Sequence, residues 1–84
     1  MTDADVKRAV IEVLATMRRR DRDEFAAEID AGGKCDSVWL VKAGVRVARL
    51  LGFKLKPGKH DAKHFKSVDT LAVYLNKRRN EENA

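Results

Sequence analysis

The chain has 84 residues, of which 44% are hydrophobic and 37% are charged, and its formal net charge is +5. This length fits one domain, which we expect to cover residues 1–84, with a core at about 4–77 and a polar tail at 78–84. A single cysteine excludes a disulfide-stapled scaffold, and no apolar run approaches the roughly 18 residues that span a bilayer. The first residues are polar and acidic, unlike a secretory signal, so we expect a discrete cytoplasmic protein.

The positive charge is concentrated in the middle of the chain. Residues 34–66 carry nine basic and two acidic side chains, whereas residues 1–33 carry six basic and eight acidic ones. Residues 67–84 carry three of each. A cationic segment of this kind indicates an acidic partner, such as nucleic acid, an anionic membrane or an acidic protein surface.

Hydrophobic spacing predicts an all-α fold that begins with an amphipathic helix at residues 4–18. Its apolar stripe repeats every three or four residues and consists of Val6, Val10, Val13, Leu14 and Met17. A short helical turn follows around residues 24–29, where Phe25 and Ile29 are four residues apart and tuck onto the core. The Gly32-Gly33 pair ends this turn and predicts a flexible hinge.

The second long helix begins at Asp36 or Ser37, because Asp36 is a good N-cap before an apolar periodic run. Two adjacent stripes predict a wide buried face; they consist of Val38, Val41, Val45 and Ala48, and of Leu40, Gly44, Val47 and Leu51. Gly52 ends this helix. A loop follows, in which residues 53–56 alternate like a short strand.

A single helical turn is expected at residues 61–65, and Ser67 then caps the last helix. The inward-facing side chains of this helix are Val68, Leu71, Ala72 and Leu75. The polar tail is expected to fray. The sequence therefore predicts three substantial helices and a short one.

The segment Gly33-Lys34-Cys35-Asp36-Ser37-Val38 carries the candidate chemistry. It places a carboxylate and a hydroxyl at a helix N-terminus, where unpaired amides and the helix dipole favour a phosphodiester on Ser37. The same pattern is also typical of an ordinary helix start. From these residues alone, both interpretations stay open.

Over residues 4–77 the chain resembles the acyl carrier and peptidyl carrier protein family. The family signature, Asp-Ser followed by Leu or a similar residue at the start of the second helix, corresponds to Asp36-Ser37-Val38. The order of elements also matches: a long helix at 38–51, a short one at 62–65, and a last helix that opens with Ser67-Val68. The resemblance implies a small bundle of three major helices plus one short helix.

The resemblance also implies a non-catalytic carrier. A phosphopantetheinyl transferase would attach 4′-phosphopantetheine to Ser37, and the thiol of this arm would hold an acyl or aminoacyl group as a thioester. Such carriers serve fatty-acid-like, polyketide or nonribosomal-type biosynthesis. Asp36 would fix the helix start and contact the transferase, while Val38, together with Leu40 or Val41, would pack near the arm.

The second helix presents Lys42, Arg46 and Arg49, whereas members of the family usually present carboxylates there. We therefore expect these three residues to dock acyl or aminoacyl ligases or synthases through acidic patches on those enzymes. The expected carrier is a monomer that binds no membrane.

Two other functions stay open: a small basic helical nucleic-acid-binding domain, and a protein adaptor without phosphopantetheine. The 6% aromatic content argues against nucleic acid, because few side chains are present for base stacking. Ser37 has no identifiable His/Asp relay, which argues against a hydrolase.

Other reactive residues have simpler interpretations. His60 and His64 lack a ligand-spaced cysteine pair, so we expect two solvated histidines and no metal. Cys35 is expected to be a half-buried, inert thiol. Trp39 either shapes a cargo pocket or covers the core near the long loop.

Overall fold

The computed structural model describes residues 2–82, with Lys59 described by its backbone alone. These residues form four α-helices and one 3₁₀ helix, joined by loops. In chain order the helices are α1 (Asp3–Met17), α2 (Arg22–Asp30), α3 (Ser37–Leu50), the 3₁₀ helix η1 (Lys59–Phe65) and α4 (Val68–Glu82). No strand occurs in these residues. The predicted all-α class is therefore confirmed. The expected turns near residues 24–29 and 61–65 are complete short helices, α2 and η1.

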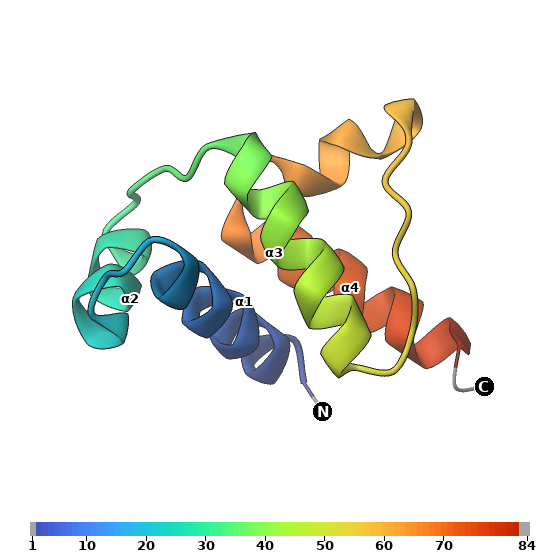
Figure 1. Cartoon of the computed structure of the whole chain (residues 1–84), viewed down its shortest axis with the longest axis horizontal. Helices are drawn as coiled ribbons and strands as arrows, with labels where there is room; N and C mark the ends of the chain where they lie inside the picture. Colours follow the sequence, from blue (N-terminus) through green and yellow to red (C-terminus); the bar gives the residue numbers. More distant parts are fainter. Residues whose placement is uncertain (1, 83–84) are drawn as a thin grey trace.

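Helix α1 packs against α2, α3 and α4, and α3 also packs against α4. The connection after α3 runs along the outside of the molecule to η1, which lies at the same end as the start of α3 (Figure 1). Because η1 packs against both α3 and α4, it covers this end of the bundle. The start of α3 thus has the α2–α3 loop on one side and η1 on the other.

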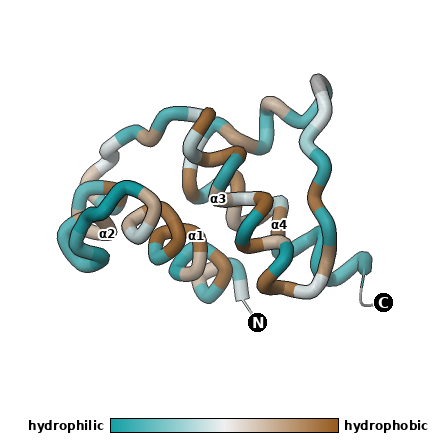
Figure 2. The backbone as a smooth tube through the Cα atoms, viewed as in Figure 1, coloured by the Kyte–Doolittle hydropathy of each residue, from teal (hydrophilic) through white to brown (hydrophobic). Residues whose placement is uncertain are grey.

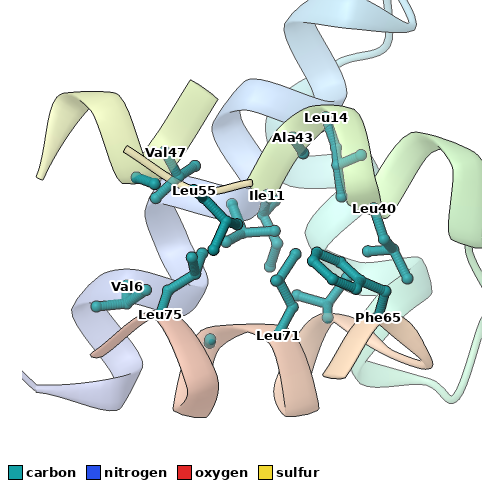
Figure 3. Close-up of a cluster of buried hydrophobic side chains, with 14 of the residues drawn as sticks. Val6, Ile11, Leu14, Leu40, Ala43, Val47, Leu55, Phe65, Leu71 and Leu75 are labelled. Carbon is teal, nitrogen blue, oxygen red and sulfur yellow. The ribbon is translucent and has the colours of Figure 1, made fainter. Parts of the chain in front are cut away.

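The core is formed mainly by α1, α3 and α4. Its largest fully buried side chains are Leu14, Leu40, Leu71, Leu75, Val6, Val10 and Val47. Figure 3 shows Phe65 of η1 pointing toward Leu40 and Leu71, so η1 is anchored in the core by this ring. All four inward-facing residues predicted for the last helix are buried.

The buried face of α3 differs from the prediction. It consists of Leu40, Ala43, Gly44, Val47 and Ala48. The stripe with Leu40, Gly44 and Val47 faces the core, whereas of the other stripe only Ala48 is fully buried and Val38 is 57% exposed. Gly44 lies on the buried face, and a Cβ there would lie 3.1 Å from Phe65 Cε1 and 3.2 Å from Leu71 Cδ1. A side chain on Gly44 would crowd Phe65 and Leu71, so the glycine suits the close approach of η1 and α4 to the inner side of α3.

Three helices end in the same hydrogen-bonded motif. After α2, the amide of Gly32 donates to the Ile29 carbonyl and that of Gly33 to the Glu28 carbonyl, with Gly32 at φ +91°. The corresponding residue is Gly52 after α3 and Arg19, at φ 55°, after α1. Positive φ favours glycine, so α1 ends with a strained residue where α2 and α3 do not.

The connection after α3 accounts for the strand-like alternation. Phe53 and Leu55 are buried, whereas Lys54 and Lys56 are exposed. Figure 2 shows this alternation of hydrophobic and hydrophilic positions along the connection. The segment is an extended loop that inserts alternate side chains into the core.

Helix α4 begins as predicted but ends later. The amide of Thr70 donates to the Ser67 hydroxyl over 3.1 Å, which confirms Ser67 as a cap. The expected fraying from residue 78 is wrong for residues 78–82, which are helical and carry an Arg78–Glu82 ion pair one turn apart. The last part of the predicted tail, 83–84, lies outside the described residues.

Candidate functional site

The loop that leads to the candidate site begins at a rigid turn. An ideal Cβ on Gly33 would lie 2.7 Å from the Glu28 carbonyl oxygen, so this position requires glycine. The predicted hinge at Gly32-Gly33 is therefore a helix cap closed by two backbone hydrogen bonds. It holds the chain against the end of α2 four residues before Ser37.

The start of α3 is fixed by Asp36, as predicted. Asp36 is the N-cap, and its Oδ1 accepts a hydrogen bond of 3.0 Å from the Val38 amide. Ser37 is the first residue of the helix and is exposed. Because the carboxylate of Asp36 forms the cap, the Ser37 hydroxyl has no part in it.

The residues after Ser37 divide between surface and core. Val38 is exposed, and Val41 is half-buried. Leu40 is fully buried, so of the two residues expected near an arm on Ser37 only Val41 has exposed surface. Leu40 belongs to the buried face of α3, together with Ala43, Gly44, Val47 and Ala48.

Trp39 joins the start of α3 to the end of α1. Trp39 is half-buried. The guanidinium carbon of Arg18 lies 5.7 Å from the centroid of its ring, and Lys42 Nζ lies 5.2 Å from it. These distances are typical of cation–π contacts. Two cations therefore lie around the ring of the residue two positions after Ser37. The ring also packs against the core, which agrees with its predicted covering role.

Cys35 is half-buried next to this cluster. Burial raises the pKa of its thiol, and the nearby Arg18 opposes that effect without cancelling it. A raised pKa leaves less thiolate at neutral pH, which fits the predicted inert thiol.

The three cations predicted to dock partners lie on α3, each within about one turn of the next, and all three are exposed. Lys42 lies over Trp39, whereas Arg46 and Arg49 line a groove between α1 and α3. This groove also contains the exposed Leu50. The predicted docking residues therefore have different neighbours at the two ends of the set.

The two histidines are not equivalent. His60 is exposed, as predicted, but His64 is half-buried and stacks on Tyr74 with ring centroids 3.9 Å apart. The prediction of a solvated His64 is wrong, because α4 supplies an aromatic ring beneath it. Among residues 2–82, no group of three or more His, Cys, Asp or Glu side chains is arranged to hold a metal ion. Nor does this part of the chain contain a helix long and apolar enough to cross a membrane.

Sequence reasoning missed Arg18 and Leu50. The contact of Arg18 with Trp39 joins residues far apart in the chain, so no local signal in the sequence predicts it. Leu50 falls outside both predicted stripes of α3, which was the one available signal that it is exposed.

No protein-family model matches the chain, and neither a curated protein nor a solved structure is detectably similar to it. The features of the chain that bear on function are therefore its own residues, foremost Asp36, Ser37 and Val38.

Proposed function

We propose that the protein is a carrier, in which Ser37 holds 4′-phosphopantetheine and the thiol of this arm carries an acyl or aminoacyl group. The observation that supports this most is that an exposed serine opens α3 while Asp36, and not the serine, caps the helix. The hydroxyl can therefore be esterified without loss of the cap.

The surroundings of Ser37 suit a phosphodiester. The first amides of α3 and the helix dipole favour negative charge at this end. Arg18 and Lys42 add two positive charges around Trp39, and Lys34 is three residues before Ser37. The exposed Val38 and the half-buried Trp39 supply apolar surface for the arm.

In this proposal the chain does no chemistry of its own. A phosphopantetheinyl transferase that recognises the helix start, including Asp36, forms the ester, and acyl or aminoacyl ligases or synthases load and unload the thiol. Tethering raises the effective concentration of the cargo at their active sites. Because α3 presents Lys42, Arg46 and Arg49, those enzymes are expected to offer acidic surfaces.

The chain offers a matched experiment, because it has two serines and both precede a valine at the start of a helix. The protein is incubated with coenzyme A and a broad-specificity phosphopantetheinyl transferase, and its intact mass is measured. We expect one phosphopantetheinyl group on the wild type and none on Ser37→Ala. Ser67→Asn, which keeps a capping side chain on α4, should load like the wild type. An unchanged wild-type mass, or equal loading of Ser37→Ala, would contradict the proposal.

A second candidate is binding to nucleic acid. Among the side chains that the structure describes, no basic residue between 34 and 66 forms an ion pair. Such cations are available to phosphates. A titration with duplex DNA at rising salt concentration tests this. A binding constant whose logarithm falls linearly with the logarithm of the salt concentration supports DNA binding, and undetectable binding at low salt removes this candidate.

A further inference from the structure

The groove between α1 and α3 lies apart from Ser37, toward the other end of α3. It is lined by Glu12, Val13, Thr16, Arg46, Arg49 and Leu50. Ser37 begins α3, whereas Leu50 ends it, so the helix separates the two surfaces by most of its length. The carrier proposal gives Arg46 and Arg49 a part in enzyme docking, but it does not say what fills the groove that they line together with Leu50.

The groove is cationic because its own acid is already paired. Glu12 Oε1 accepts a hydrogen bond of 2.8 Å from Arg22 of α2. Arg46 and Arg49 are exposed, and neither forms an ion pair with any carboxylate that the structure describes. Two guanidinium groups thus face solvent without an internal counter-charge.

The same groove has an apolar side. Leu50 is 74% exposed, more than Val38 or Val73, the other two exposed large hydrophobic residues of the described chain. Val13 is half-buried beside it and packs against the core. An exposed leucine flanked by arginines offers a contact that water fills poorly and that a nonpolar side chain fills well.

We propose that this groove binds an acidic amphipathic helix of a partner protein. A nonpolar side chain of that helix packs on Leu50 and Val13, and carboxylates about one turn apart pair with Arg46 and Arg49. The spacing supports this, because the two arginines are three residues apart on one face of α3 and match carboxylates of similar spacing. A flat polyanion would pair with the arginines but would leave Leu50 uncovered.

The test uses the full chain with Ser37 unmodified, labelled with ¹⁵N, and two synthetic helical peptides. One has a leucine with glutamates one turn to either side, and the other has lysines in place of the glutamates. We expect the acidic peptide to cause saturable amide shifts at Val13, Thr16, Arg46, Arg49 and Leu50. The lysine peptide should cause none.

Charge reversal provides the matched control. The double variant Arg46→Glu, Arg49→Glu should bind the acidic peptide at least about tenfold more weakly and gain binding of the lysine peptide. Lys54→Glu, Lys56→Glu makes the same change in net charge outside the groove and should bind like the wild type. Leu50→Ser, at an exposed position, should weaken binding without unfolding the protein.

Three results would overturn the proposal. The first is the absence of saturable shifts in the groove, and the second is that both charge-reversed variants bind the acidic peptide equally weakly. The third is that duplex DNA displaces the acidic peptide at a lower concentration than the peptide itself needs to bind. None depends on Ser37. Conversely, the charge-reversed groove variant should still be loaded with phosphopantetheine, so failure of the groove and failure of the carrier proposal are separate results.

Discussion

The Val38 amide donates to Asp36 Oδ1 over 3.0 Å, so the carboxylate before Ser37 holds the first turn of α3. Asp36→Ala should lower the free energy of unfolding by about 1 kcal/mol, because it leaves that amide without its cap. Asp36→Asn keeps a capping oxygen and should stay within a few tenths of a kcal/mol of the wild type. Urea denaturation measures both. Equal losses in the two variants would show that the charge, and not the cap, is what stabilises α3.

A second prediction concerns the end of α1, where Arg19 has φ 55°. A non-glycine residue in this conformation costs about 1 kcal/mol, so Arg19→Gly should stabilise the protein by up to that amount. Gly52 has the equivalent position after α3, and Gly52→Ala should destabilise the protein by a similar amount. Thermal unfolding should therefore move in opposite directions for the two variants. A shift of both in the same direction would contradict the argument from φ.

Cys35 should react slowly, because burial raises the pKa of its thiol. Alkylation by iodoacetamide at pH 8 should be slower than that of a free cysteine and should recover its normal rate in urea. Arg18→Gln removes a charge that favours the thiolate, so it should slow the reaction further. A rate in the folded protein that equals the rate in urea would show that the thiol is open to solvent.

The start of α1 predicts a pH effect in acid. The Thr2 amide and hydroxyl both donate to the Asp5 carboxylate, which lowers the pKa of Asp5 below its ordinary value. A lowered pKa contributes stability that is present at neutral pH and lost as the pH falls through the folded-state pKa, below about pH 4. In Thr2→Ala the NMR titration midpoint of the Asp5 carboxyl carbon should move upward. Because Thr2→Ala keeps the backbone amide, an unchanged midpoint would assign the whole shift to that amide and none of it to the hydroxyl.

Lys7 connects three helices. Its Nζ lies 2.8 Å from Asp69 Oδ1 of α4 and 3.3 Å from Asp30 Oδ1 of α2. The hydrogen bond to Asp69 is the main reason that the pKa of Lys7 is raised, so the interaction is fully present at neutral pH and is lost only above the ordinary lysine range. Both carboxylates are largely exposed, so Lys7→Met should cost less than about 1 kcal/mol. This loss should shrink as salt increases, and urea denaturation at two salt concentrations checks it.

Local signals in the sequence were sufficient for the helix starts. Asp36 and Ser67 act as caps within three residues of themselves, so their roles need no knowledge of the rest of the chain. The inner face of α4 was equally clear, because it has one apolar stripe and polar residues elsewhere.

The inner face of α3 could not be predicted in the same way. Both of its stripes are apolar, so periodicity gives the width of the face but not its direction. In the folded chain Gly44 lies on the buried side, where Phe65 and Leu71 approach it closely. Contacts such as Arg18 over Trp39 and His64 on Tyr74 likewise join residues that are far apart in the chain or on different elements. They depend on how whole helices pack.

Trp39 is the one tryptophan of the chain, and it is half-buried beneath Arg18 and Lys42 two residues after Ser37. The intrinsic fluorescence of the protein therefore originates from a single indole at the start of α3. Emission from this ring reports on its immediate surroundings at the start of α3, whereas the groove near Leu50 is at the other end of the helix and is not lined by Trp39. The unlabelled protein thus contains its own optical probe, which distinguishes events at the two ends of one helix.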